Sequence, residues 1–570
     1  MARFDAGFCH VSDISRAAPE YALKTRHRES IHVRIRPIRL CNCGMLVLLM
    51  DLDLRICSQA RLSRDPHFDG RFFIGVRSSG VYCRPICPAR TAREENVRYF
   101  PTAAAAAEAG FRPCLRCRPE SSPGTPAWLG TSATVSRALR LISESALEDG
   151  GVEALAERLG IGSRHLRRLF LQHVGATPAA VAKTRRLHFA KKLIDETTLP
   201  LGEIALASGF GSVRRFNSAF QDTYQRSPSQ IRKLAHLSGA LPENQYCFRL
   251  RYRPPFQWES LLAFLAPRAT PGVECVADGT YSRTIDLDGK VGLLAASLNE
   301  TSMALEIRLS FPEPRSLFRI VERVRRMFDL GAEPSAMIAH LKSDSLLARR
   351  VLNKPGLRVP GAWDGFELAV RAILGQQVSV KGATTLAGRL ADQFGKRVNQ
   401  GSNLTRLFPS PRVLAESDVS RIGLPKNRAQ TIRELAREVH EGRLTFDASQ
   451  SHEEFRSRLQ QISGIGDWTS QYISMRALGD VDAFPASDLG LLKNSGIDSP
   501  RALTERAQAW RPWRAYAAMY LWQGDAELSV TGSVGAIQED DSTTKRNSYR
   551  QSDSTFEESL HGSNVELCRG

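Results

Sequence analysis

The 570-residue chain lacks long apolar runs, because none reaches the roughly 18 residues that are needed to span a bilayer. The short run MLVLLM at 45–50 is followed by no small-residue cleavage pattern, so we expect neither a signal peptide nor a membrane partner. The eleven cysteines are unevenly spread and do not fit a secreted disulfide scaffold of this size. We therefore predict a cytoplasmic protein in a reducing compartment.

Acidic residues are outnumbered, with 60 Asp and Glu against 78 Lys and Arg, and the formal net charge is +18. This excess favours a polyanionic partner, although a merely basic soluble protein would have the same composition. The excess is concentrated in residues 131–240, which hold 16 Lys and Arg against 9 Asp and Glu. A nucleic acid is the partner that this composition favours.

The chain is too long for one hydrophobic core and predicts roughly three to five domains. SSPGTP at 121–126 and HLSGALPEN at 236–244 have the composition of linkers. The basic, aperiodic start of the chain is interpreted either as an upstream start-codon error or as a disordered arm. We predict these divisions: an N-terminal extension, 1–49; a cysteine-cluster domain, 50–122; a basic helical domain, 130–235; a domain with strand-like runs and one helix, 245–355; a second helical domain, 356–525; and a disordered tail, 526–570.

Four cysteines have the spacing of a metal site. Cys83, Cys87, Cys114 and Cys117 form C-x3-C-x26-C-x2-C, and each close pair can hold one side of a tetrahedral ion. The alternative is four free cysteines in a core. Thiolate ligands with this spacing favour Zn²⁺.

Two helix-turn-helix patterns follow one another in the basic domain. In each pattern a helix ends near a glycine, Gly160 or Gly209, and a second helix rich in arginine follows. An ordinary bundle with a solvated basic face is the alternative, but two such patterns in tandem favour binding of double-stranded DNA. The side chains that we expect to face a major groove are Arg164, Arg167, Arg168, Arg214, Arg215 and Asn217.

A glycine turn and a carboxylate lie close together near the end of the second helical domain. Gly464, Ile465 and Gly466 open a helix, and such a turn lets backbone N–H groups approach a phosphate. Asp488 follows Trp468 by twenty residues and lies just past a proline, where the chain leaves the helix. Asp488 is either a helix cap or a carboxylate that points into a cleft. The pattern predicts an enzyme that grips DNA and acts on one nucleotide.

The segments GRFFIGVRSSGVYCRPICPAR and GFRPCLRCRP resemble the metal-binding domain of the Ada family, and the basic domain resembles the AraC-type regulators. The resemblance implies that Cys83 accepts a methyl group from a DNA methylphosphotriester, once per molecule. A zinc-bound thiolate stays deprotonated, which suits this role. Methylation would remove a negative charge and strengthen DNA binding. The implied partners are methylphosphotriesters, promoter sites and RNA polymerase.

Residues 245–525 resemble the AlkA-type alkyladenine glycosylases of the helix–hairpin–helix superfamily. The resemblance rests on GFELAVRAILGQQVSV, LPKNRAQTIRELA, ISGIGDWTSQYISMRAL, the Asp488 segment and WRPWRAYAAMYLW. It implies that Asp488 is the catalytic carboxylate and stabilises an oxocarbenium-like state while an alkylated base such as 3-methyladenine leaves. A further role for Asp488, in orienting or deprotonating the attacking water, stays open.

The same resemblance implies a pocket for the flipped base. Trp468, Tyr472 and Trp522 correspond to its lining, where aromatic faces attract a cationic base, although core aromatics are the commoner case. Gln377 stands where the family's founding member has an apolar wedge. Backbone carbonyls around Gln460, Ile462 and Gly464 correspond to a monovalent cation site.

Several features narrow the activity further. Trp468 occupies the position of the Schiff-base lysine in bifunctional relatives, so a monofunctional glycosylase is expected. Cys247, Cys275 and Cys568 form no cluster, which argues against an iron–sulfur branch. No Pro-Cys-His-Arg motif is present, so the guanine-alkyltransferase domain of Ada is not expected.

We therefore predict a multidomain, mainly α protein of a nucleoid-associated, bacterial type. Its expected parts are a small zinc-bound α/β domain, an AraC-type double helix-turn-helix, a TBP-like antiparallel sheet domain, and an all-α glycosylase domain. The expected enzyme is a DNA-3-methyladenine glycosylase II with an additional single-turnover methyl transfer. The alternative is an alkylation-responsive transcriptional regulator with a weak or inactive glycosylase half.

Overall fold

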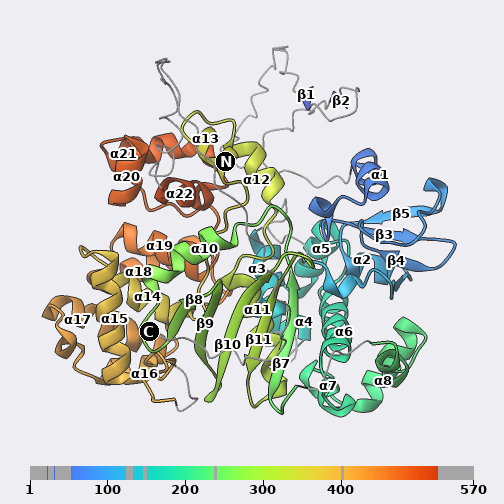
Figure 1. Cartoon of the computed structure of the whole chain (residues 1–570), viewed down its shortest axis with the longest axis horizontal. Helices are drawn as coiled ribbons and strands as arrows, with labels where there is room; N and C mark the ends of the chain where they lie inside the picture. The colour runs from blue at the N-terminus through green and yellow to red at the C-terminus, as the bar shows by residue number, and fades with distance from the viewer. Residues whose placement is uncertain are drawn as a thin grey trace, which may run out of the picture. The chain divides into compact units, whose positions relative to one another are not determined.

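The computed structural model describes residues 53–123, 133–144, 151–235, 241–398 and 403–523, together with two short paired strands (Figure 1). Those strands, β1 (Ala22–Leu23) and β2 (Ile31–His32), are antiparallel and belong to a unit of their own, residues 1–50. The predicted disordered tail and most of the predicted N-terminal extension and linkers lie outside the described residues. In the part of the chain that is described, no helix is long and apolar enough to cross a membrane.

The cysteine-cluster domain is a small sheet with two helices. Its strands have the order β5-β3-β4-β6, in which only the pair β4 and β6 is parallel. Asp53 caps the first helix, because its side chain accepts the backbone N–H groups of Arg55 and Ile56. The elements are α1 (Leu54–Ser63), β3 (Phe73–Val76), β4 (Val81–Cys83), β5 (Val97–Phe100), α2 (Ala103–Glu108) and β6 (Arg112–Pro113).

The basic domain contains the two predicted helix-turn-helix units. In both units a glycine in the left-handed region separates the helices, Gly160 at φ +70° and Gly209 at φ +72°. A long central helix, α6, lies between the units in the chain. The helices are α3 (Ala133–Ser143), α4 (Gly151–Arg158), α5 (Ser163–His173), α6 (Pro178–Glu196), α7 (Leu201–Ala207), α8 (Val213–Tyr224) and α9 (Pro228–Lys233).

A five-stranded antiparallel sheet follows, with the strand order β7-β11-β10-β9-β8. The strand-like runs expected within 245–355, YCFRLRY and MALEIRLSF, form β7 and β11, and the expected helix LFRIVERVRRMFDL forms α11. The elements are β7 (Gln245–Arg251), α10 (Trp258–Leu265), β8 (Glu274–Ala277), β9 (Thr280–Leu287), β10 (Lys290–Asn299), β11 (Ala304–Ser310) and α11 (Leu317–Met327).

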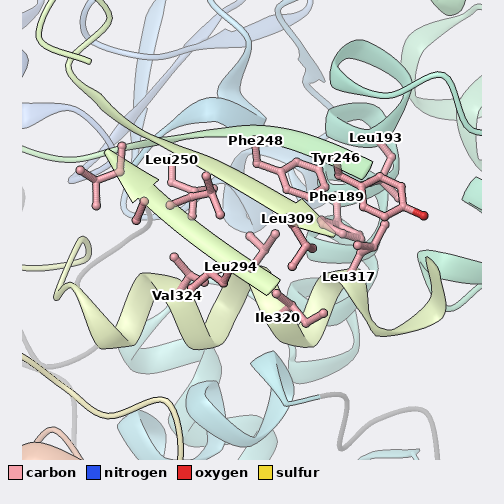
Figure 2. Close-up of a cluster of buried hydrophobic side chains, with 14 of the residues drawn as sticks. Phe189, Leu193, Tyr246, Phe248, Leu250, Leu294, Leu309, Leu317, Ile320 and Val324 are labelled. Atoms are coloured by element: carbon pink, nitrogen blue, oxygen red, sulfur yellow. The ribbon is translucent and has the colours of Figure 1, made fainter. Parts of the chain in front are cut away.

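One apolar core covers this sheet (Figure 2). Leu294 and Leu309 of the sheet lie against Ile320 and Val324 of α11, and all four are nearly inaccessible to solvent. Phe189 of α6 belongs to the same core, and the centroid of its ring lies 5.0 Å from the ring centroid of Phe318. Burial of a large apolar side chain contributes about 1.5–3 kcal/mol, so this core binds the basic domain to the sheet domain firmly.

The remaining residues form helices. The sequence periodicity predicts one buried face made of Phe366, Val370, Ile373, Leu374 and Val378. The first four lie on α14 and are buried, but the prediction is wrong for Val378, which lies past the end of that helix and is 41% exposed. The helices are α12 (Pro334–Leu341), α13 (Ala348–Asn353), α14 (Gly365–Leu374), α15 (Val380–Phe394), α16 (Pro411–Glu416), α17 (Lys426–His440), α18 (His452–Gln460), α19 (Asp467–Ala477), α20 (Leu489–Ser495), α21 (Pro500–Arg506) and α22 (Arg514–Trp522).

The two helices that precede the second helical domain pack with its last helices. Met337 and Leu341 of α12 and Val351 of α13 share a core with Leu503 and Trp510. The predicted fold class, mainly helical with a zinc-type domain, two helix-turn-helix units and an antiparallel sheet, is confirmed.

Candidate active site, metal centre and DNA-facing surfaces

The four clustered cysteines meet at one end of the small sheet. Cys83 ends β4, Cys87 follows in the next turn, and Cys114 and Cys117 come directly after β6. The parallel pairing of Tyr82 with Pro113 brings these two segments together. The four sulfur atoms all lie within 4.8 Å of one another, and none of the four cysteines is in a disulfide.

This donor set fits zinc. Tetrahedral Zn²⁺ with Zn–S distances of about 2.3 Å separates its sulfur ligands by about 3.8 Å, which the observed cluster allows. Cys83 and Cys117 are buried, while Cys87 and Cys114 are partly exposed. The site is therefore closed on one side and reachable from the other.

A buried arginine beside the cluster was not predicted from the sequence. Arg84 is 2% exposed; its backbone N–H lies 3.4 Å from the Cys117 sulfur, and its Nη1 donates to the Cys117 carbonyl at 3.0 Å. Its Nε donates to Asp69 Oδ1 at 2.8 Å. The buried Arg84–Asp69 ion pair therefore anchors the Cys117 segment beside the cluster. Its adjacency to Cys83 is the signal that could have identified it.

The predicted DNA-facing residues lie on the second helix of each helix-turn-helix unit. Arg164, Arg167 and Arg168 on α5 are exposed, while Leu166 and Phe170 of the same helix are buried. On α8 the exposed residues are Arg214, Arg215 and Asn217, and the buried ones are Phe216 and Phe220. Both helices therefore hold their apolar face in the core and leave the arginines accessible, as a major-groove helix requires.

The glycine turn joins α18 to α19 in a helix–hairpin–helix arrangement. Gly464 has φ +88°, and a Cβ there would lie 2.3 Å from Thr431 Oγ1, so the close packing excludes a side chain. The Thr431 hydroxyl donates to the Ser463 carbonyl at 2.8 Å. Ile465 is buried and anchors the turn, while Gly466 is exposed at the start of α19. The first N–H groups of a helix have no partner within that helix and can therefore face a phosphate.

Asp488 is both a helix cap and the centre of a cluster. Its Oδ1 accepts the backbone N–H of Leu491 at 3.1 Å, which caps α20. The same oxygen accepts the indole N–H of Trp522 at 2.9 Å, and Oδ2 accepts that of Trp468 at 2.9 Å. The two interpretations of Asp488 from the sequence are therefore compatible, since the cap also fixes the orientation of the carboxylate.

Aromatic rings surround this carboxylate. Trp468 and Tyr472 are stacked, with ring centroids 5.4 Å apart and planes inclined by 9°. Tyr472 also packs edge-to-face against Trp522, with ring centroids 6.1 Å apart. Trp522 further lies 6.2 Å from Phe264 of α10, a residue of the sheet domain that the sequence did not indicate. All three predicted pocket aromatics therefore lie together beside Asp488.

A charged residue lies behind the aromatic rings. Arg476 Nη1 donates to the Tyr472 hydroxyl at 2.7 Å. Burial acts to raise the pKa of this phenol, but the positive charges of Arg476 and Arg268 outweigh it and lower the pKa. Trp468, Tyr472 and Arg476 are spaced by four residues on α19, and this helical spacing could have revealed the arginine.

Gln377 lies exposed at the turn between α14 and α15. Its φ of +56° is in the left-handed region, which is uncommon for a residue other than glycine. The neighbouring Gln376 ties this turn to the hairpin, because its Nε2 donates to the Gly464 carbonyl at 2.9 Å and to Thr469 Oγ1 at 3.0 Å. The turn that carries Gln377 is thus held against the hairpin.

Comparison with known proteins agrees with these parts. Residues 56–120 match the family model "Metal binding domain of Ada", residues 155–234 match "Helix-turn-helix domain", and residues 247–364 match "AlkA N-terminal domain". Fold and site together define a regulator with a four-cysteine metal centre and tandem helix-turn-helix units, joined to a helix–hairpin–helix domain.

Proteins of similar sequence match longer stretches of this chain than the family models do. The Mycobacterium tuberculosis protein named "Probable bifunctional transcriptional activator/DNA repair enzyme AlkA" is 42% identical over 82% of this chain and 96% of its own length. The chain belongs to this family. The Escherichia coli protein "DNA-3-methyladenine glycosylase 2" is 33% identical over 48% of this chain and 96% of its own length. The E. coli protein "Bifunctional transcriptional activator/DNA repair enzyme Ada" is 41% identical over 21% of this chain and 33% of its own length.

Metal removal should unfold the cysteine-cluster domain selectively. Structural zinc contributes on the order of 10 kcal/mol to the folding of small domains, and this domain has only a small core of its own. We expect a strong chelator to release one zinc per chain and to open residues 53–123 to limited proteolysis, while residues 365–522 stay protected. An unchanged cleavage pattern after verified loss of the metal would contradict the assignment.

Proposed function

We propose that this protein repairs alkylated DNA and also regulates transcription in response to the damage. Its C-terminal half would act as a DNA-3-methyladenine glycosylase, and its N-terminal half would accept a methyl group from a DNA methylphosphotriester. The observation that carries the first activity is the Asp488 carboxylate, held by the two indole N–H groups of Trp468 and Trp522. Double-stranded DNA is the proposed partner of both halves.

The hairpin and the turn at Gln377 would grip and open the duplex. The backbone at Gly464, Ile465 and Gly466 would bind a phosphate, since a helix N-terminus favours an anion. Gln377 would enter the gap that the flipped nucleotide leaves, and its amide would hydrogen-bond there. A monovalent cation on the carbonyls of Gln460, Ile462 and Gly464 would add positive charge beside that phosphate.

The pocket would select a base by its charge. Alkylation of a ring nitrogen makes the base cationic, and the faces of Trp468, Tyr472 and Trp522 attract a cation. The Tyr472 hydroxyl accepts a hydrogen bond from Arg476, which would hold that guanidinium away from the base. A neutral, undamaged base would gain less in this pocket.

Asp488 would then stabilise the reaction. The N-glycosidic bond breaks, and its electron pair leaves with the base, which loses its positive charge. The sugar becomes oxocarbenium-like, and the carboxylate stabilises that charge until water attacks C1′ and gives its proton to Asp488. Trp468 stands where an imine-forming lysine would be needed for strand cleavage, so the product would be an abasic site in an intact strand.

Cys83 would act once as a methyl acceptor. Zinc, when bound, keeps the cysteine sulfurs deprotonated and nucleophilic. The C–O bond of the methylphosphotriester breaks as the S–C bond forms at Cys83, and the phosphate oxygen keeps the electron pair. The cluster loses one negative charge, while Arg84 keeps its positive charge. DNA would then bind the basic domain more tightly, and recruitment of RNA polymerase at promoter sites would follow.

A weak or inactive glycosylase half remains the second candidate function. The exposed arginines on α5 and α8 favour the regulatory role by themselves, without any contribution from Asp488. Excision assays on Asp488 variants separate the two candidates.

Asp488→Asn should lower the rate of 3-methyladenine release from methylated DNA by about 10²–10³-fold, because the charge that stabilises the sugar cation is lost. Affinity for the DNA should change little. Asp498→Asn is the matched control, since Asp498 is an exposed carboxylate in the same domain. Wild-type protein that releases no 3-methyladenine, or an Asp488→Asn variant with full activity, would overturn the enzyme proposal.

Exposure to methylphosphotriester DNA should add one methyl group per chain, located on Cys83 by peptide mass spectrometry. Cys83→Ala should abolish the uptake, whereas Cys57→Ala should retain it, because Cys57 is buried in a separate cluster. Mapping of the wild-type protein keeps the test valid even if Cys83→Ala loses its metal. A methyl group on Cys87, Cys114 or Cys117 instead would contradict the assignment.

A further inference from the structure

An arginine-lined cavity of about 300 Å³ lies apart from the sites described above. Its walls come from α3 and α4 of the basic domain, from α11, and from the segments around Asp364 and Phe446. Five arginines line it, namely Arg140, Arg158, Arg319, Arg323 and Arg326. Neither DNA binding nor base excision, as proposed above, uses this cavity.

Helical spacing places three of these arginines on one side of α11. Arg319, Arg323 and Arg326 follow one another at intervals of four and three residues, while Ile320 and Val324 are buried on the other side. Like charges on one helix face repel one another. Negative charge nearby would relieve this repulsion.

The carboxylates of the cavity supply part of that charge. A carboxylate oxygen of Glu144 lies 3.4 Å from Nε of Arg140 and 3.3 Å from Nη2 of Arg326. A carboxylate oxygen of Asp447 lies 3.0 Å from Nη2 of Arg158. The third lining carboxylate, Asp364, caps α14 through its Oδ1. Arg319 pairs with Asp288, which is not among the residues that line the cavity.

Two guanidinium groups are only partly compensated, since Arg326 shares Glu144 with Arg140 and the charge of Asp364 acts on Arg323 without an ion pair. Arg323 lies over the ring of Trp363 at 5.3 Å, and within the described residues it has no ion pair with a carboxylate. The Nη1 atom of Arg326 is buried and has no hydrogen-bond partner there. Burial lowers the pKa of Arg323, as expected for a cation removed from water. A buried donor without an acceptor costs about 1–3 kcal/mol, so an anion with several oxygens would be favoured here.

We propose that this cavity binds a small phosphate-bearing anion, of the size of inorganic phosphate or a mononucleotide. The planar donors of Arg323 and Arg326 suit phosphate oxygens, which they can contact in pairs. A duplex is excluded by size, because even the major groove of B-DNA is about 12 Å wide and the helix itself is wider than this cavity. Since Arg140 belongs to α3 and Arg323 to α11, the bound anion would link the basic domain to the sheet domain.

The test is binding of inorganic phosphate and of adenosine monophosphate to the full chain, by calorimetry at constant ionic strength. Wild-type protein should bind at least one of the two with one site per chain. Arg323→Ala should weaken this binding by about tenfold or more, the equivalent of one charge-assisted hydrogen bond. Arg501→Ala is the control; Arg501 is also a helical arginine, its side chain is 92% exposed, and it lies outside the cavity.

Glu144→Gln provides a second variant with the opposite expectation. Removal of this carboxylate frees Arg140 and Arg326, so phosphate binding should tighten by about threefold to tenfold. This variant keeps the test valid if Arg323→Ala fails to fold, which the thermal midpoint without ligand reveals. Three results would each overturn the proposal. The first is that wild type binds neither anion, the second is an equal loss of binding in Arg501→Ala, and the third is displacement of the anion by a short unmodified duplex.

Discussion

The Asp488 carboxylate is fixed by three N–H donors, and the arrangement of the candidate site depends on this interaction. The donors come from α19, α20 and α22, so the same hydrogen bonds that orient the carboxylate also hold these helices in register. Trp468 is thereby stacked on Tyr472, and Trp522 is turned edge-on to the same ring. Loss of one indole N–H would loosen the carboxylate and the aromatic cluster beside it together.

Helix α19, which carries Trp468 and Tyr472, is also the helix that the basic domain contacts. Arg140 of α3 donates to the carbonyls of Leu478 and Ala477 at the C-terminal end of α19. A cation at a helix C-terminus is favoured by the helix dipole, typically by about 0.3–1 kcal/mol. The arginine cavity begins at this contact, since Arg140 and Ala477 both line it. Regulation and repair therefore share a structural element in this chain.

Patterns that are local in sequence could be predicted, and contacts that join distant segments could not. The spacing of Cys83, Cys87, Cys114 and Cys117 was enough to expect one cluster, because paired ligands have few other uses. The positions of Arg84 against Asp69 and of Phe264 against Trp522 depend on tertiary packing between segments that share no periodicity. The same reason explains why α12, which the sequence groups with the sheet, also shares an apolar core with Leu503 and Trp510. The left-handed backbone conformation of Gln377 could not be predicted from the sequence, because glutamine rarely adopts it.

The single-turnover rate of 3-methyladenine excision by Trp522→Phe tests the central claim most directly. Phenylalanine keeps an aromatic ring in the pocket but removes the N–H that holds Asp488 Oδ1. A hydrogen bond to a charged group is worth about 1.5–3 kcal/mol, so the account predicts a rate roughly 10- to 100-fold lower at saturating DNA with affinity for the DNA nearly unchanged. An unchanged rate, or a loss explained entirely by weaker DNA binding, would contradict it.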